Sequence, residues 1–543
     1  MTQKTETILL GFIILFAIGL KGFYFVDMQS NPLTDFTANI PKFDQERFVR
    51  LAKEFIHRNW LGEKYQTFSP IYSYFLAVIF KIFGENLNYV LGFQMVWGVL
   101  AIAVFYKTAK LLFQNVWVGL VAASLAAFYG PFLCYEGLIK RDILIAYSFL
   151  FGLYSLLRGL NSHQALNFFL AGLSIGFATI LRPHILPMFL VIYLMWDVPR
   201  DFQFPKKLNG LFILGLLIMI LPLAIRNNAL GRNDILSSPD PEIFWIGNTY
   251  DSSGIDYVIL DSTKSLSQET QGRVLKTFQV FLREIKLHPL SYGELYLRKI
   301  KMFFNGYEIP GNVNFQLYRE LNKSLRWALF DFKIICPLAL LGLILAYKKF
   351  PYISLLYLFL ISLSLNILVF HIQSRYRIVV VPFFLLFASY TLYSFYQFLK
   401  QREFLKFIQL FLLLGFMFLL TKPDETFIAK YFKGSIRPGD YVNLSNAYIH
   451  SYKWNQGKLT LKQRDVLFSQ AVFYLNKASM NPNQKSVAGS HDVITLLNQG
   501  IVHYNLGQSE KAKSVFQNIL SLEPPNETAE FYLKLMRHDE QNF

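Results

Sequence analysis

Charged residues are scarce in this sequence, and so is cysteine. Only 16% of the 543 residues are charged, whereas soluble domains carry about 25%, so the composition excludes an ordinary soluble globular protein. The two cysteines, Cys134 and Cys336, lie in or beside apolar runs, which excludes a disulfide framework. No His and Cys residues have the spacing of a metal site. The sequence therefore requires no cofactor, and any divalent metal would be held by oxygen ligands.

Hydrophobic and aromatic residues are abundant. They make up 53% and 17% of the chain, and amphipathic aromatic side chains favour the headgroup level of a bilayer. The formal net charge of +17 would suit a nucleic-acid partner, but many of the cations lie in short turns between apolar runs. The composition predicts a membrane protein without a nucleic-acid partner.

Apolar runs that are long enough to cross a bilayer recur along the chain. A span needs about 20 apolar residues, and this rule predicts an all-α polytopic protein with about eleven transmembrane helices. The spans are expected at 7–26, 87–106, 116–135, 142–158, 164–181, 184–197, 209–225, 331–347, 351–370, 378–397 and 404–420. The first is interpreted as a retained helix, because no small-residue cleavage site follows it.

Lysine and arginine gather in alternate short connections between these spans. Such a bias marks cytoplasmic loops. The residues concerned are Lys107, Lys110, Arg158, Arg200, Lys206, Lys207, Lys348, Lys349, Lys400, Arg402 and Lys406. We expect a multi-pass protein of the cell (inner) membrane, with a cytoplasmic N-terminus and with the large loops and the C-terminus on the outer, periplasmic side.

Two long loops are expected outside. The first, 27–86, contains an amphipathic stretch from Phe43 to Trp60 and an apolar one from Pro70 to Phe83, which suits a helix lying at the interface. The second, 226–330, has a mixed composition, with a predicted helix from Gln271 to Ile285.

The tail, 440–543, carries the one repeat signal of the chain. Its small residues and its terminal proline have the spacing of a tetratricopeptide repeat, in which two helices cross closely. These residues are Gly500, Gly507, Ala512, Phe516 and Pro524. A small α-helical domain that binds an acceptor or a partner, without chemistry of its own, is expected there.

Five cations violate the charge bias, because they lie at outer ends of predicted spans. They are Lys140, Arg141, Arg182, Arg375 and Arg377. A phosphate at the outer headgroup level would explain them, since Arg binds phosphate bidentately and Lys binds it as a point charge. The alternative is that each side chain snorkels to ordinary lipid headgroups.

Three acidic residues accompany these cations. Asp44 begins the amphipathic stretch of the first loop, where it suits either a helix N-cap or a catalytic role. Glu136 and Asp142 flank Lys140 and Arg141, as simple ion pairs or as a general base beside a phosphate-binding partner.

Asp44, Trp60 and Pro70 follow one another as an acidic residue, a helix ending in Trp and a Pro-led interfacial helix. This order resembles the GT-C superfamily of membrane glycosyltransferases, and within it the dolichyl-phosphate-mannose protein mannosyltransferases and bacterial aminoarabinose transferases. Further segments that resemble this family are 171–187, 223–257, 283–308 and 371–382. The resemblance covers the membrane domain, 1–425, and bacterial members often carry C-terminal tetratricopeptide repeats.

The resemblance implies transfer of a sugar from a polyprenyl-phosphate donor to an acceptor hydroxyl, with inversion at the anomeric carbon. Asp44 would be the base, the outer cations would stabilise the leaving phosphate, and Glu136 or Asp142 would orient the acceptor or hold a divalent metal. The sequence departs from the family at Gln45, which separates two acids that are often adjacent, and at Ser69, which replaces a lysine before Pro70. The sugar and the acceptor, which can be a protein, lipid A or another glycan, therefore stay open.

Three other classes of protein remain as alternatives. A transporter or flippase would show repeated halves and ionisable groups near the middle of the bilayer. A non-catalytic scaffold would not need the large 226–330 loop. A glycan polymerase or ligase with a lipid-diphosphate donor would use outer arginines too, and only the Asp44 loop argues against it.

Overall fold

The computed structural model describes most of the chain. The described residues are 2–39, 43–62, 69–183, 206–232, 235–236, 241–255, 260–423, 438–454 and, in the tail, 507–522 with scattered positions between 463 and 536. Within them the elements are helices, and the one β-type pairing is an isolated bridge between Tyr129 and Phe330. The all-α fold class predicted from the sequence is confirmed.

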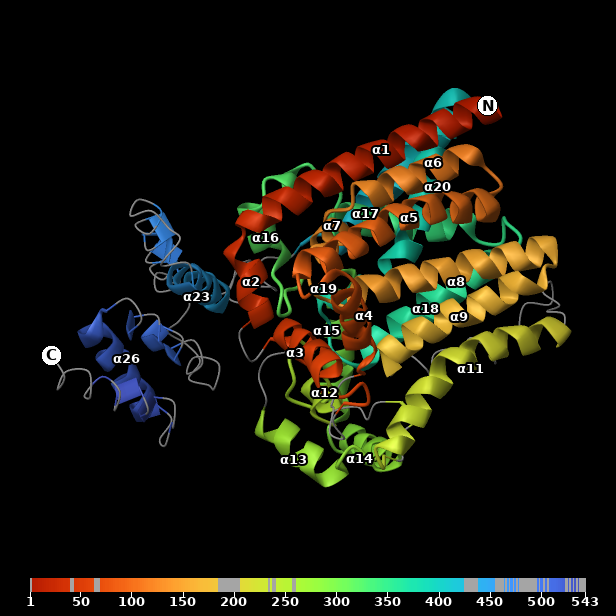
Figure 1. The fold of residues 1–543 in the computed structure, drawn as a ribbon. Coiled ribbons are helices and arrows are strands. Elements are labelled where there is room, and N and C mark those ends of the chain that lie inside the picture. The colour runs from red at the N-terminus through yellow and green to blue at the C-terminus, as the bar shows by residue number, and fades with distance from the viewer. Residues whose placement is uncertain are drawn as a thin grey trace. The chain divides into compact units, whose positions relative to one another are not determined.

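The chain forms two compact units. One consists of Met1–Met28 with Asp44–Asp424, and the other of Gln29–Phe43 with Glu425–Phe543. The first loop, expected at 27–86, is therefore divided between them. Figure 1 shows the helices of both units.

Five stretches of the first unit are long and apolar enough to cross a membrane. They are Gln3–Ser30, Leu87–Phe113, Asp142–Ser162, Asn209–Ala229 and Phe404–Thr421. The helices that contain them are α1 (Gln3–Asp27), α5 (Leu87–Phe113), α8 (Asp142–Ser162), α11 (Lys206–Ala229) and α21 (Phe404–Thr421). Each coincides with a predicted span, because length and apolarity are local properties of the sequence.

Helices that do not meet both criteria occupy the other predicted spans that the structure describes. They are α6 (Val116–Ala127), α7 (Gly130–Glu136), α9 (Ala165–Leu181), α17 (Phe332–Ala346), α18 (Ile353–Val369) and α20 (Val381–Lys400). The span expected at 116–135 is broken into α6 and α7, because Phe330 exchanges backbone hydrogen bonds with Phe128 and Gly130. The span expected at 184–197 lies outside the described residues.

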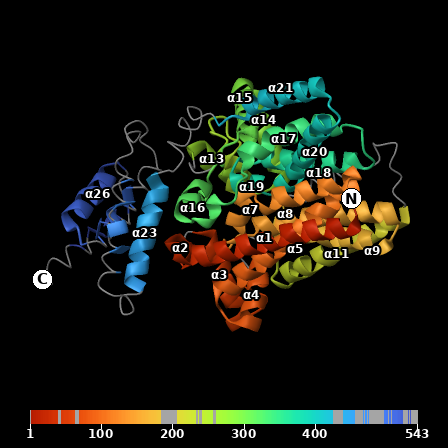
Figure 2. The same cartoon turned by 90° about the horizontal axis from the view of Figure 1, so that it is seen from above.

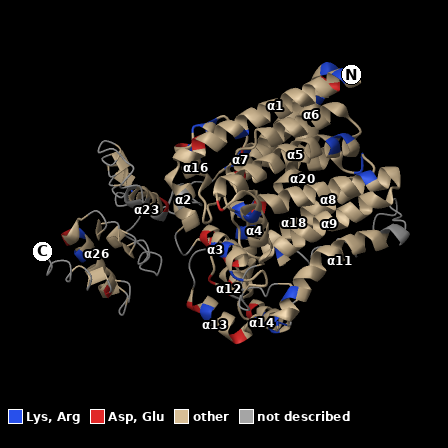
Figure 3. Cartoon of the chain, viewed as in Figure 1, with Lys and Arg blue, Asp and Glu red and all other residues tan. Residues whose placement is uncertain are grey.

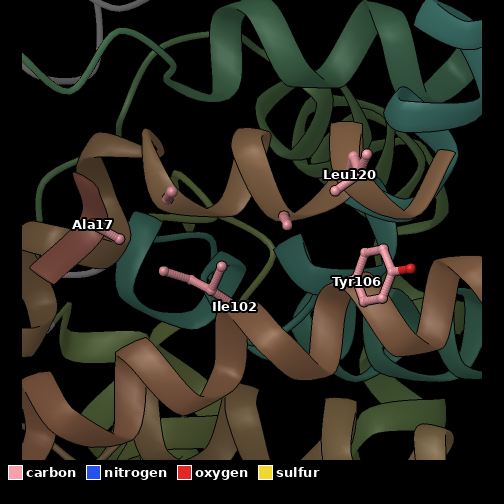
Figure 4. Packing of buried hydrophobic residues seen from close by; sticks show 6 residues of the cluster. Ala17, Ile102, Tyr106 and Leu120 are labelled. Atoms are coloured by element: carbon pink, nitrogen blue, oxygen red, sulfur yellow. The ribbon is translucent and has the colours of Figure 1, made fainter. Parts of the chain in front are cut away.

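Small residues let the spanning helices approach closely. Gly172 of α9 and Gly215 of α11 face each other's backbones, and a Cβ on Gly172 would lie 2.0 Å from the Phe212 carbonyl oxygen. Close approach of this kind is how helices associate in a bilayer, where apolar side chains gain little by leaving lipid. Figure 4 shows a second contact, in which Ala17 of α1 packs with Ile102 of α5 and Leu120 of α6.

The two loops of the first unit are helical as well. α3 (Asp44–His57) and α4 (Ile71–Phe83) fall where the interfacial helices are predicted, and they pack together. The large loop holds α12 (Pro241–Ile246), α13 (Asp261–Thr270), α14 (Val274–Leu287), α15 (Pro289–Phe304) and α16 (Phe315–Leu321). Charged residues gather around α3, α13 and α14, whereas α9 carries none (Figure 3).

The second unit combines α2 (Pro32–Asn39) and α23 (Pro438–Trp454), which pack together, with α26 (Ser509–Leu522). Ala512 and Phe516 are buried in α26. A Cβ on Gly500 would lie 2.6 Å from the Phe516 ring, which is the close approach that the repeat spacing requires. Pro524 lies outside the described residues, and the tetratricopeptide repeat stays a prediction.

Candidate active site

The Asp44 carboxylate is the centre of a polar cluster. Its Oδ2 atom accepts hydrogen bonds from Lys140 Nζ at 2.9 Å, from Arg375 at 2.8 Å and from Asn312 at 3.2 Å. No described backbone N–H of α3 donates to this carboxylate, so within the described residues Asp44 does not cap its helix. Oδ1 accepts no hydrogen bond from the described residues, and the side chain is 25% exposed. The carboxylate can therefore meet a ligand through Oδ1.

The electrostatics keep Asp44 ionised. Burial raises the pKa of its carboxyl group, whereas the charges of Lys140 and Arg375 lower it. The lowering by the cations outweighs burial, and the net pKa lies well below the usual range of an aspartate. Asp44 thus holds its cations strongly and, while it does so, is a weak base.

Lys140 and Arg141 occupy the turn between α7 and α8. Lys140 is buried, which lowers the pKa of its amine, while Asp44 acts in the opposite direction. Arg141 donates to the Leu181 carbonyl at 2.8 Å. Burial and the positive charge of Arg182 lower the pKa of Arg141 to about 10. Burial is the larger cause of both shifts, and the neighbouring Arg375 and Arg182 add to them. A bound anion would oppose both effects.

Arg182, at the end of α9, joins the same cluster. It forms an ion pair with Asp142, and both side chains are buried. Its guanidinium carbon lies 4.4 Å from the centre of the Tyr376 ring, and that of Arg375 lies 4.7 Å from the same point. Tyr376 therefore connects the two arginines, and its hydroxyl accepts a hydrogen bond from Arg375 at 2.7 Å.

Arg377 is not brought to this cluster, although it lies two residues from Arg375 in α19 (Ser374–Arg377). Its guanidinium group pairs with Glu308 at 2.9 Å and donates to the carbonyls of Phe303, Asn305 and Tyr307. Arg377 is 1% exposed. These contacts fasten the segment after α15, and they occupy the donors that a phosphate would need.

Glu136 also lies in a separate group. It is fully buried, forms an ion pair with Lys21 of α1 and accepts a hydrogen bond from the Tyr147 hydroxyl at 2.5 Å. Gly98 of α5 makes room for this carboxylate, since a Cβ there would lie 2.0 Å from Glu136 Oε1. Its partners are side chains of other helices, so the group joins α1, α7 and α8.

Two cluster members, Tyr376 and Asn312, are not among the residues singled out from the sequence. Tyr376 lies between Arg375 and Arg377 in the sequence. An aromatic ring between two arginines favours cation–π contacts, so this pattern could have indicated Tyr376. Asn312 is one of many loop asparagines, and no pattern marks it.

Lys299 of α15 holds the segment that leads to α19. It is buried, and its Nζ donates to Asn248 Oδ1 at 2.9 Å, to the Leu368 carbonyl at 3.2 Å and to the Phe370 carbonyl at 2.6 Å. These carbonyls belong to the C-terminal end of α18, where unpaired carbonyls need donors. These three hydrogen bonds of Lys299 fix the start of the chain segment that carries Arg375.

No group of three or more His, Cys, Asp or Glu side chains in the described part of the chain could hold a metal ion. Asp142 is engaged with Arg182, and Glu136 with Lys21. The cluster thus offers carboxylates that are already paired with cations, which is the arrangement for an anionic ligand.

Two solved structures of the Archaeoglobus fulgidus oligosaccharyltransferase resemble the chain remotely. One is the apo form, with 13% identity and a TM-score of 0.44. The matched region covers 87% of this chain and 60% of the chain in that structure. The other, in complex with an inhibitory peptide and a dolichol-phosphate, has 14% identity and a TM-score of 0.43, with coverages of 86% and 59%. This chain thus spans about 60% of the length of these structures. No curated protein matches it.

A family model covers part of the chain that supplies the cluster. The matched segment, residues 68–225, includes Lys140, Arg141, Asp142 and Arg182. The model is that of the Dolichyl-phosphate-mannose-protein mannosyltransferase family, so over this segment the resemblance to GT-C membrane glycosyltransferases that the sequence predicted is confirmed.

Proposed function

We propose that this protein is a membrane glycosyltransferase that moves a sugar from a polyprenyl-phosphate donor to an acceptor hydroxyl. The observation that carries the proposal is the Asp44 carboxylate, which is held between Lys140 and Arg375 while its Oδ1 atom accepts no hydrogen bond from the described residues. The family match over 68–225 supports it, because that family is described by a dolichyl-phosphate-linked sugar.

The cations of the cluster are the proposed site of the donor phosphate. Lys140, Arg141, Arg182 and Arg375 exceed the two carboxylates Asp44 and Asp142, so the cluster carries excess positive charge. A phosphodiester supplies the missing negative charge, and guanidinium groups bind its oxygens in pairs. Arg377 is left out of this group because Glu308 and three carbonyls occupy its donors.

Donor binding would turn Asp44 into a better base. Lys140 and Arg375 hold its pKa low before the donor binds. A phosphate that competes for these two cations weakens their hold, so the pKa of Asp44 rises and Oδ1 can accept a proton. Donor binding and base activation are then coupled through shared cations.

The reaction follows from this arrangement. The acceptor hydroxyl oxygen bonds to the anomeric carbon as its proton passes to Asp44 Oδ1. The bond from that carbon to the phosphate oxygen breaks, and its electron pair leaves with the lipid phosphate. The cations stabilise the charge that develops on this leaving group. A single displacement of this kind inverts the anomeric carbon.

The test uses the purified protein in lipid vesicles with several radiolabelled polyprenyl-phosphate sugars. At least one donor is expected to release its sugar to water or to an acceptor, and an Asp44→Asn variant serves as the control. Consumption of a lipid-diphosphate sugar, with every monophosphate donor ignored, would assign the protein to the polymerase or ligase class instead.

A further inference from the structure

Two consecutive helices of the large loop each present an apolar stripe that the rest of the chain leaves uncovered. On α14, Leu275, Phe278 and Leu282 are 72%, 58% and 43% exposed. On α15, Leu290 and Leu297 are 83% and 70% exposed. These side chains recur at intervals of three, four and seven residues, so each set lines one face of its helix.

These stripes are not the faces by which the two helices pack against the rest of the first unit. α14 buries Val280 and Glu284, and α15 buries Tyr292, Leu295 and Lys299. The exposed apolar side chains lie on the opposite side of each helix, with Gln279 and Glu294 at the edges of the stripes. The polar residues Lys276 of α14 and Ser291 of α15 lie between the two faces. A soluble surface helix needs one apolar face, so the second one requires an apolar surrounding.

Hydrogen bonds place α15 at the ends of spanning helices. Just after α15, the Gly306 N–H donates to the carbonyl of Thr421, the last residue of α21, at 2.8 Å. One turn before its end, Lys299 binds the terminal carbonyls of α18. Figure 2 shows α15 next to α21. Both anchors lie where spanning helices end, which is the level of lipid headgroups.

Basic residues border the stripes. Arg273, Lys276, Lys286 and Lys301 are exposed on α14, on α15 or beside them, and Glu294 is an exposed acid among them. Long basic side chains at this level reach lipid phosphates, while apolar neighbours enter the acyl-chain boundary. The charge therefore favours a lipid surface over a second, equally basic copy of the chain.

We infer that α14 and α15 lie in the headgroup layer of the bilayer, with their apolar stripes inserted among the acyl chains. The large loop is then a membrane-embedded part of the protein on that side. Lys299 on the buried face of α15 holds the segment before Arg375. Lipid contact on the exposed face of α15 therefore helps to keep Lys299, and through it Arg375, in position.

Site-specific labelling tests the inference. Cys134 and Cys336 are both fully buried, so a cysteine introduced at an exposed position takes the label selectively. Leu290→Cys is compared with Ser291→Cys on α15, and Phe278→Cys with Lys276→Cys on α14. Each variant receives an environment-sensitive fluorophore in lipid nanodiscs, and unmodified protein gives the labelling background.

Acyl-chain-brominated lipids are expected to quench the Leu290 and Phe278 labels severalfold more than their polar-face controls, and aqueous iodide is expected to do the reverse. Equal iodide quenching at all four positions would show that the stripes face water and would overturn the inference. Protection of the stripe labels from both quenchers, with energy transfer between labelled copies, would assign the stripes to a dimer interface and would overturn it as well.

Discussion

Asp44 is the residue on which the proposed chemistry depends. Replacing it by Asn keeps the volume and leaves an amide near Lys140 and Arg375, so the protein should fold and bind donor. The base is lost, and transfer should fall by at least about a hundredfold. Single-turnover transfer with saturating donor measures this. Glu46→Gln, which alters an ion pair with the exposed Arg50 in the same helix, is the control and should stay near the wild-type rate. A comparable rate for Asp44→Asn would move the base elsewhere.

Substitutions of Arg375 test the proposed phosphate site. Arg375→Ala should weaken donor binding by about 1.5–3 kcal/mol, the contribution of a hydrogen bond to a charged group. Arg375→Lys should rescue it only partly, because lysine lacks the planar fork. A donor-binding titration on folded protein gives both values.

Arg377 is the matched contrast, since it carries the same side chain two residues away. Arg377→Ala leaves Glu308 buried without its cation, which costs about 3–5 kcal/mol of stability when a buried pair is broken. Loss of donor affinity in a stable Arg377→Ala protein, with Arg375→Ala unaffected, would contradict the assignment of the two arginines.

The pH response of Asp44 has a defined sign. Its folded-state pKa lies below the unfolded value, so its ionised form adds stability above the unfolded pKa, and this contribution is lost as pH falls through the folded one. Arg375→Ala removes a cation that lowers this pKa. The acid limb of kcat/KM, which reports the donor-free protein, should therefore move to higher pH in this variant. A limb that stays in place would show that Asp44 does not control it.

At the scale of helices, the buried Glu136 group depends on the absence of a side chain in α5. In Gly98→Ala the new methyl group would overlap Glu136 Oε1, and overpacking of this kind costs about 1–3 kcal/mol. Gly92 lies in the same helix, and a Cβ added there would meet nothing within 4 Å, so Gly92→Ala should be neutral or stabilising. Thermal unfolding in detergent compares the two. Equal melting temperatures would show that the helices relax without cost.

For the whole molecule, the alternating cations predict that the C-terminus lies outside the cytoplasm. A reporter that is active only in the cytoplasm, fused after Phe543, should be silent, and the same reporter inserted at 114–115, between α5 and α6, should be active. An active C-terminal fusion would change the number of crossings by one and would contradict the placement of the five cations at outer ends of spans.

The sequence by itself determined where the helices lie. Apolar run length, helical spacing and charge bias are local or additive along the chain, so α1, α5, α8 and α21 fall on their predicted spans. The amphipathic α3 and the helix expected at 271–285 follow from periodicity in the same way. The same reasoning drew attention to Lys140 and Arg182 as residues at the ends of spans, and to Asp44 as the start of an amphipathic stretch.

Only the tertiary structure decided which of these side chains meet. Arg375 and Arg377 look equivalent in the sequence, but residues two apart on a helix point in different directions, and one binds Asp44 while the other binds Glu308. Glu136 lies close to Lys140 in the chain and still pairs with Lys21 of α1. Partners this distant along the chain are set by how the helices pack, which no local pattern encodes.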